Sequence, residues 1–272
     1  MILSTITWTA DPEIFQVGNF AVRWYGVLFA LGFAVGYFIM LNFFKKEKIP
    51  VKLLDQLTTY MVVATIIGAR LGHCLFYEPA YYLSNPVEIL KVWEGGLASH
   101  GAAIAILLAV YLFARKNKLS YWWAIDRIAL VTALAGFFIR MGNLMNSEIF
   151  GRPTTLPWGF IYANASDPEQ RLQPRHPTQI YEGIAYLLIF ALLMFIYYRK
   201  DGKPREGSLI SLFVLLVFGA RFFIEFLKES QVDFENAMAL NMGQWLSIPF
   251  ILAGAAGLFL IYRKPGKKVK PV

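Results

Sequence analysis

The sequence has 272 residues, of which 57% are hydrophobic and only 16% are charged, and its mean hydropathy is +0.49. Soluble domains are usually about 45–50% apolar, so this composition excludes an ordinary soluble protein and indicates a membrane protein. A net charge of +8 is compatible with a nucleic-acid partner, but the placement of the basic residues argues against one. The single cysteine, Cys74, excludes an internal disulfide and a cysteine-based metal cluster.

Seven apolar stretches are each about as long as the ~20 residues that a helix needs to cross a hydrocarbon core of about 30 Å. In chain order they lie near 25–44, 54–76, 98–114, 121–140, 178–198, 207–227 and 243–262. The sequence therefore predicts an all-α polytopic membrane protein with about seven transmembrane helices, in which 1–272 form a single membrane domain.

Basic residues cluster in every second connection between these stretches. Sixteen of the 26 lysines and arginines lie there, in the segments 45–52, 115–118, 199–205 and 263–270. The positive-inside rule makes this side cytoplasmic. We therefore expect the N-terminus outside, the C-terminus inside and a basic cytoplasmic tail over 263–272. Because membrane topology explains the excess charge, no nucleic-acid partner is expected.

The longest connection, 141–177, lies on the outer side between the fourth and fifth stretches. It contains several glycines, prolines and asparagines. These residues favour turns and chain reversals. The segment is therefore predicted to form a small cap of strands and turns.

Three arginines, Arg70, Arg140 and Arg221, lie within the apolar stretches. A charge at the centre of a membrane helix costs about 2.5–3.5 kcal/mol on insertion scales. With a rise of about 1.5 Å per residue, polar residues from six stretches fall in the outer half of the membrane: Tyr25, Arg70, His100, Arg140, Glu182 and Arg221. Their common depth favours a site for an anionic lipid head group. The alternative is a set of ion pairs that only stabilise the helix bundle. This alternative is stronger for Arg70 alone than for the whole cluster.

The densest polar run covers 140–152. If the helix continues past Arg140, Asn143 falls on the same face. Guanidinium offers a planar fork of donors to a phosphodiester, and Asn143 and Asn146 offer donors and acceptors to a hydroxyl or an ester. Glu148 is placed to balance an arginine, and Gly151 permits close backbone approach. The alternative is a helix-end loop without function.

Two further patterns carry candidate chemistry. Arg221 and Glu225 are four residues apart, which is the spacing of an intrahelical ion pair. Together with Arg140, however, Arg221 would form a clamp for a phosphate. His100 opens a stretch from the outside within a glycine-rich turn and is the best general-base candidate, because imidazole titrates near neutral pH. A structural role is its alternative. No histidine and carboxylate spacing indicates a metal site.

Six motifs in one order resemble the bacterial phosphatidylglycerol–prolipoprotein diacylglyceryl transferase family over about residues 11–262. They are WYG at 24–26, GGLASHG at 95–101, RMGNLMNSEIFGR at 140–152, RHPTQIYE at 175–182, GARFFIE at 219–225 and MGQWLSIP at 242–249. The run at 140–152 resembles the family signature. One departure is Ser147, which stands where the family usually has glycine, and this tightens the permitted backbone.

The resemblance implies a transferase of the bacterial inner membrane with its active site toward the periplasmic leaflet, so that the N-terminus and the cap are periplasmic. Its substrates are phosphatidylglycerol and prolipoprotein signal peptides with a lipobox cysteine. The thiol attacks the lipid, a thioether to diacylglycerol forms and glycerol-1-phosphate leaves; no cofactor is implied. The implied catalytic residues are Tyr25, His100, Arg140 and Arg221, and the implied substrate-binding residues are Arg140, Asn143, Asn146, Glu148, Gly151 and Glu225.

The main competing hypothesis is a lipid transporter or flippase with an outer-leaflet anionic site. Such a protein is expected to carry polar residues at the membrane midplane, broken helices there and an inverted repeat. None of these features is evident in the sequence, where the polar cluster lies higher. The sequence therefore favours the enzyme.

Overall fold

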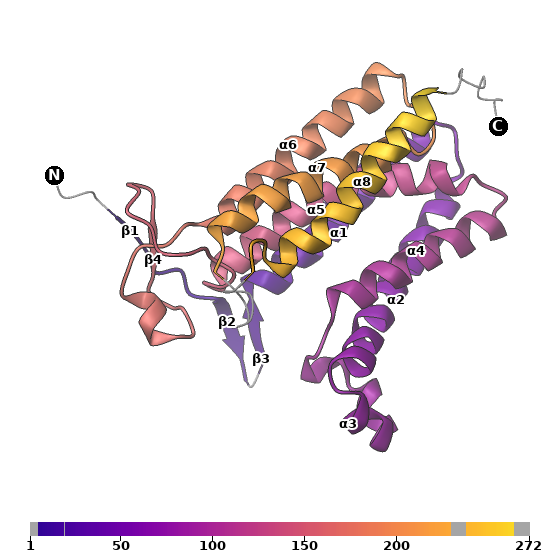
Figure 1. The fold of residues 1–272 in the computed structure, drawn as a ribbon. Helices are drawn as coiled ribbons and strands as arrows, with labels where there is room; N and C mark the ends of the chain where they lie inside the picture. Colours follow the sequence, from indigo (N-terminus) through magenta and orange to yellow (C-terminus); the bar gives the residue numbers. More distant parts are fainter. Residues whose placement is uncertain (1–4, 19, 230–237, 264–272) are drawn as a thin grey trace. The chain divides into compact units, whose positions relative to one another are not determined.

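The computed structural model describes residues 5–18, 20–229 and 238–263. Among these residues seven helices are long and apolar enough to cross a membrane, which confirms the predicted fold class. They are α1 (Trp24–Lys46), α2 (Val51–Phe76), α4 (Ser99–Lys116), α5 (Tyr121–Met145), α6 (Thr178–Arg199), α7 (Ser208–Ile224) and α8 (Met242–Arg263), labelled in Figure 1. The basic tail predicted over 263–272 lies outside the described residues except for Arg263.

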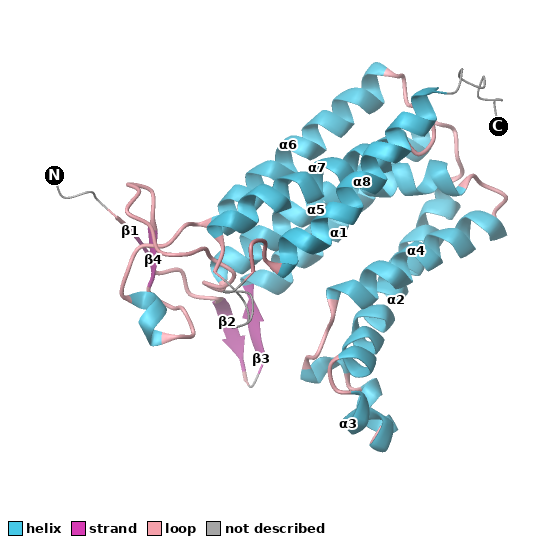
Figure 2. Ribbon diagram, viewed as in Figure 1, coloured by secondary structure: helices cyan, strands magenta, loops and turns pink. Residues whose placement is uncertain are grey.

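Short elements occupy the connections, as Figure 2 shows. The strands are β1 (Ile6–Trp8), β2 (Glu13–Val17), β3 (Phe20–Arg23) and β4 (Phe160–Tyr162), and the short helices are α3 (Pro79–Ser84), η1 (Pro86–Leu90), η2 (Val92–Glu94), η3 (Pro168–Arg171) and η4 (Glu225–Leu227). β2 and β3 form an antiparallel hairpin, whereas β1 and β4 pair in parallel.

The chain divides into two compact units. The first comprises residues 1–39 and 128–272, and the second comprises 40–127. The first unit therefore contains most of α1 and α5 and all of α6, α7 and α8. The second contains α2, α3 and α4. The single membrane domain expected from the sequence stays a prediction.

In the first unit the long helices run side by side (Figure 1). Small residues let α8 approach α7 closely. A side chain at Gly254 would meet the Ser211 carbonyl oxygen and the Leu215 backbone nitrogen, both 2.7 Å from its Cβ. One turn earlier, Phe218 and Phe250 stack with ring centroids 4.3 Å apart. Close packing through small residues is typical of helices in lipid, where dispersion replaces the hydrophobic effect.

A small cap lies beyond the end of α5 and contains the β1–β4 pair. Leu144, Phe160, Tyr162 and Ala165 form its buried core. The indole nitrogen of Trp8 in β1 donates to the Leu144 carbonyl at 3.0 Å, which ties β1 to the end of α5. Strands and turns are as expected here, but α5 includes the first five residues of the predicted 141–177 segment.

In the second unit, α2 and α4 meet through glycines, because a side chain at Gly72 would lie 2.7 Å from the Gly101 Cα. Arg70 on α2 is buried and donates to backbone carbonyls only: Nε to Ile89 at 3.0 Å, Nη2 to Glu88 at 2.5 Å and Nη1 to Gly95 at 2.6 Å. No sequence pattern marks these partners, which lie 18 to 25 residues away. The contacts favour the structural interpretation of Arg70, which anchors the loop between α2 and α4.

Candidate active site

The polar run at 140–152 begins on the last turns of α5 and then reverses direction. The helix continues to Met145, so Arg140 and Asn143 lie on one helical face, as the sequence predicted. Ser147 and Ile149 follow with φ values of 52° and 57°. These are left-handed conformations that cost non-glycine residues of order 1 kcal/mol or more. Ser147 therefore occupies a position where glycine is conformationally favoured.

A hydrogen-bonded chain joins the polar side chains of this run. Arg140 Nη1 donates to Asn143 Oδ1 at 3.1 Å, and Asn143 Nδ2 donates to Glu148 Oε1 at 2.8 Å. Asn146 Nδ2 reaches the same carboxylate oxygen at 3.2 Å. Two amide groups thus hold Glu148, and Asn143 stands between its carboxylate and the Arg140 guanidinium.

A second chain of alternating charges runs from Arg140 to Arg221 across three segments. Arg140 Nε lies 2.7 Å from Glu182 Oε2 on α6, and Glu182 Oε1 accepts from Lys228 Nζ at 2.9 Å. The same ammonium lies 3.4 Å from Glu225 Oε2, which is 3.9 Å from Arg221 Nε. The two arginines that the sequence singled out are therefore linked through two carboxylates and one lysine.

Burial is graded along this chain. The side chains of Glu182, Lys228 and Glu225 are 1%, 5% and 6% exposed, whereas Arg140 is 16% and Arg221 is 35% exposed. Buried ions are stable only when they are paired. Glu182, Lys228 and Glu225, at the centre of this row of charges, therefore pair with one another and with the arginines. The two arginines at its ends are the members most accessible to an anion.

Two glycines allow close packing around Tyr25 and Glu225. A Cβ at Gly142 would lie 2.8 Å from the ring of Tyr25, so the start of α1 packs directly on α5. A Cβ at Gly243 would lie 2.5 Å from the Glu225 carboxylate, so α8 covers that group closely. Both glycines belong to motifs that the sequence analysis identified.

Gly151 lies where the signature run meets the segment after α7. Its N–H donates to the His176 carbonyl at 2.8 Å, and the N–H of Arg152 donates to the Leu227 carbonyl at 2.9 Å. Gly151 and Lys228 form an antiparallel bridge, and a side chain at Gly151 would collide with the Leu227 carbonyl oxygen. Glycine at this position therefore brings Lys228 next to the signature run.

The first turn of α6 supports the same region. Gln179 donates to the Glu148 carbonyl at 2.6 Å and accepts from the Tyr162 hydroxyl at 3.0 Å. Burial raises the pKa of Tyr162, so this hydroxyl stays a donor. His176, just before α6, is also buried, and this burial and the nearby Arg152 guanidinium lower its pKa, which favours the neutral form.

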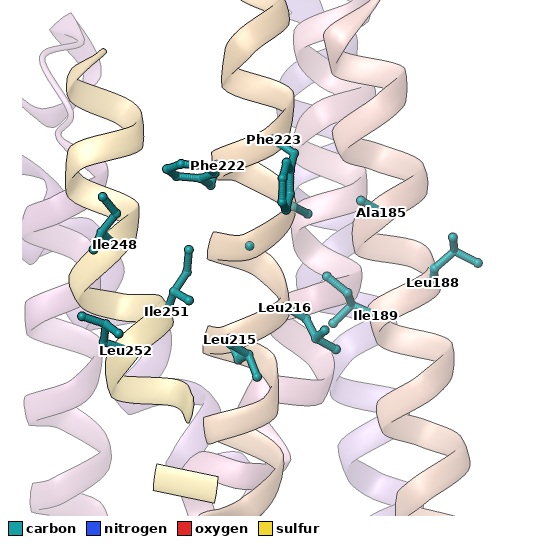
Figure 3. Close-up of a pocket in the computed structure, with 12 residues that line it drawn as sticks. Ala185, Leu188, Ile189, Leu215, Leu216, Phe222, Phe223, Ile248, Ile251 and Leu252 are labelled. Carbon is teal, nitrogen blue, oxygen red and sulfur yellow. The ribbon is translucent and has the colours of Figure 1, made fainter. Parts of the chain in front are cut away.

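An apolar groove of about 700 Å³ opens between α6, α7 and α8 (Figure 3). Leu188 and Ile189 line it from α6, and Ile251 from α8. Four α7 residues that line it flank Arg221 in the chain: Gly219, Ala220, Phe222 and Phe223. The groove thus borders the helix segment that carries the more exposed arginine of the charge chain.

The first unit gathers most of the residues predicted from the sequence: Tyr25, Arg140, Asn143, Asn146, Glu148, Gly151, Arg221 and Glu225. His100 belongs to the second unit, where it is exposed in the first turn of α4. Its role stays a prediction.

The sequence analysis counted Glu182 among the polar residues of the outer half but did not name it as a catalytic or substrate-binding residue, and it did not single out Lys228. The i, i+3 spacing of Lys228 from Glu225 was the available signal. Within the described residues, no group of three His, Cys, Asp or Glu side chains could hold a metal ion.

Comparisons with known proteins show to which family the chain belongs. The sequence profile of the prolipoprotein diacylglyceryl transferases matches residues 12–260. The chain belongs to this family. It is therefore a transferase of diacylglyceryl groups, and its seven apolar helices make it a multi-pass membrane protein.

Several curated relatives cover nearly the whole chain, and each is named phosphatidylglycerol–prolipoprotein diacylglyceryl transferase. The relative from Tolumonas auensis is 47% identical, over 93% of this chain and 96% of its own. That from Chloroherpeton thalassium is 47% identical, over 94% of each chain. That from Bacteroides fragilis strain YCH46 is 42% identical, over 98% of this chain and 99% of its own.

Proposed function

We propose that this chain transfers the diacylglyceryl group of phosphatidylglycerol to the lipobox cysteine of prolipoproteins, at the periplasmic leaflet of the bacterial inner membrane. The cysteine sulfur attacks the glycerol C3 carbon that carries the phosphate ester. The C–S bond forms as the C–O bond breaks, glycerol-1-phosphate leaves with the bonding electrons, and the thiol proton passes to a base. A cationic clamp stabilises the negative charge that develops on the leaving phosphate.

The observation that carries this proposal is the charge chain that joins Arg140 to Arg221. Each arginine is paired with a buried carboxylate, and the arginine side chains are more exposed than the carboxylates. Arginine binds phosphate oxygens through a planar fork of N–H donors. Asn143, Asn146 and Glu148 continue the hydrogen-bonded chain from Arg140, and we assign these polar groups to the glycerol part of the lipid.

The apolar groove beside Arg221 supports the same substrate. A lipid needs an apolar surface for its acyl chains next to the group that binds its phosphate. The groove is lined by aliphatic and aromatic side chains of three membrane helices (Figure 3). Charged clamp and apolar groove together match an anionic phospholipid better than a soluble anion.

Mass spectrometry tests the proposed reaction directly. The purified protein in phosphatidylglycerol-containing nanodiscs is incubated with a peptide that carries a lipobox. We expect the cysteine to gain one diacylglyceryl group and glycerol phosphate to be released, while a peptide with serine in place of the cysteine stays unmodified. Lipid movement between leaflets without any covalent product would contradict the enzyme and support the transporter alternative.

The groove yields a prediction at Gly219, where a Cβ would have no neighbour within 4 Å. Gly219→Leu should therefore fold normally and place its side chain in the groove. We expect the KM for long-chain phosphatidylglycerol to rise about 3- to 10-fold, on the order of 1 kcal/mol of lost apolar contact. Short-chain phosphatidylglycerol should be affected less.

A matched control for Gly219→Leu is Leu260→Trp, which adds bulk at an exposed position of α8 outside the groove. It should leave both KM values unchanged. Equal effects of Gly219→Leu on long-chain and short-chain lipid would show that the groove does not hold acyl chains.

The general-base role of His100 is proposed from the family resemblance. His100→Asn should slow transfer most near neutral pH, where a thiol is still largely protonated and an ordinary imidazole is free to take its proton. At lower pH an imidazole is itself protonated, so the difference from the wild type should shrink. The measurement is the pH–rate profile of the variant beside that of the wild type. His73→Phe is the control, because His73 stacks with Tyr77 in the same unit and phenylalanine retains that packing. A profile of unaltered shape in His100→Asn would remove His100 from this role.

A further inference from the structure

We infer that Lys228 is a positioning residue whose ammonium neutralises Glu182 and Glu225 and so leaves the charges of Arg140 and Arg221 for the lipid phosphate. This inference rests on the proposed function. It assigns a role to a residue that none of the recognised sequence motifs contains.

The first step of the argument is the placement of the ammonium. Lys228 Nζ lies 2.9 Å from one carboxylate and 3.4 Å from the other, and its side chain is only 5% exposed. A lysine usually reaches water with its charged end, because the aliphatic stem is long and flexible. Here the charge is instead held between two acids that are themselves almost fully buried.

The second step is the charge count. The chain from Arg140 to Arg221 contains three cations and two carboxylates, so the ammonium cancels charge that would otherwise fall on the guanidinium groups. Without it, Glu182 would face Arg140 alone, and Glu225 would face Arg221 alone. Each arginine would then be neutralised by its own partner. An arginine whose charge is already balanced attracts a phosphate less strongly.

The third step is the way the backbone holds Lys228 in place. Gly151 forms an antiparallel bridge with Lys228, and the Arg152 N–H donates to the Leu227 carbonyl. The Lys228 N–H donates to the Glu225 carbonyl at 3.2 Å. The signature run and η4 therefore both hold the Lys228 backbone, as expected for a residue that must keep one position.

The test compares three variants in the transfer assay with phosphatidylglycerol as the varied substrate. Lys228→Met removes the charge but keeps an unbranched side chain, and we expect the KM for phosphatidylglycerol to rise at least tenfold, with a smaller change in kcat. Lys228→Arg retains the cation and should restore KM to within about threefold of the wild type. Lys228→Met combined with Glu225→Gln removes one positive and one negative charge, and it should recover part of the affinity that Lys228→Met loses.

The matched control is Arg175→Met. Arg175 is also a buried cation, and it pairs at 2.5 Å with Glu229, the residue that follows Lys228 in the sequence. Arg175 is not one of the charges that link Arg140 to Arg221. We expect a lower folded yield and an unchanged KM. If Lys228 is merely structural, Lys228→Met will lower the folded yield and leave KM unchanged, as Arg175→Met does, and the double variant will also leave KM unchanged.

The possible outcomes separate the inference from the proposed function. If the wild type produces no diacylglyceryl peptide, the proposed function fails. If the wild type is active and folded Lys228→Met keeps the wild-type KM, only the inference fails. Should Lys228→Met not fold, the arginine variant and the double variant decide. The inference is overturned if Lys228→Arg raises KM tenfold over the wild type. It is also overturned if the double variant shows a KM at least tenfold above that of the wild type.

Discussion

Arg140→Ala should abolish diacylglyceryl transfer while the protein remains folded. Glu182 loses one of its partners in this variant, but Lys228 still lies 2.9 Å from its carboxylate, so no buried charge is left unpaired. The phosphate loses a forked donor that stabilises the leaving group. Removing one such electrostatic contact usually costs about 10²- to 10³-fold in kcat. The measurement is the transfer rate of purified protein that elutes as a single folded species.

Two further variants make the Arg140 result specific. Arg140→Lys keeps the charge but loses the planar fork, so we expect an intermediate rate. Arg70→Gln removes an arginine that donates only to backbone carbonyls, so it should lower the folded yield and leave the affinity of the folded fraction for phosphatidylglycerol unchanged. Full activity of Arg140→Ala would remove the clamp from the proposed mechanism.

Gly151→Ala should cause the second large loss, for a steric reason. The added methyl group would collide with the Leu227 carbonyl oxygen and lie 2.8 Å from side-chain carbons of His176 and Thr178. A backbone oxygen cannot rotate away, so the bridge to Lys228 must open. Overpacking of this kind typically costs about 1–3 kcal/mol, and displacement of Lys228 should lower transfer by a further large factor. The measurements are thermal stability and the specific transfer rate.

Gly26→Ala provides the comparison for Gly151→Ala. A Cβ at Gly26 meets nothing within 4 Å, and alanine favours the helix there. Its thermal stability should equal or exceed that of the wild type. If Gly151→Ala matches the wild type in both stability and rate, the close approach at Gly151 has no functional importance.

Much of the fold could be predicted from hydropathy alone, because a membrane helix must satisfy its backbone internally and must be apolar along its length. All seven predicted spans are found as helices, with ends that differ by a few residues. α5 illustrates the difference: the helix runs to Met145, five residues past the predicted end at 140, because Arg140 and Asn143 find polar partners there. Hydropathy cannot register such partners.

The arginines of the candidate site could be predicted, because a charge in an apolar stretch stands out in the sequence. The residues that pair with them could not, because they are distant in the sequence. Arg140 and Arg221 are conspicuous because charges in apolar helices are costly. Arg70 is equally conspicuous, yet its partners are carbonyls that carry no sequence signal. Lys228 escaped notice because it follows the last apolar residues of its span, where lysines are ordinary. Its significance comes only from the two carboxylates that α6 and α7 bring to it.

The charge chain also explains how a membrane protein can keep several ions in its interior. Burying an isolated ion costs several kcal/mol even after relaxation. Alternation of sign along the chain pairs every buried member, and the arginines at its ends are the least buried. The same arrangement that stabilises the fold thus presents two guanidinium groups to a ligand. We expect folding and lipid binding to depend on overlapping residues here, which is why rates must be compared per folded molecule.

The most direct measurement is a double-mutant cycle for phosphatidylglycerol affinity with Arg140→Gln and Arg221→Gln in nanodiscs. If both arginines hold one phosphate, each single change should remove most of the shared interaction, and the double change should add little. We therefore predict a coupling free energy of at least about 1 kcal/mol, within the range of residues that share a partner. Additive losses, within about 0.5 kcal/mol, would show that the two arginines act on separate groups and would contradict this account.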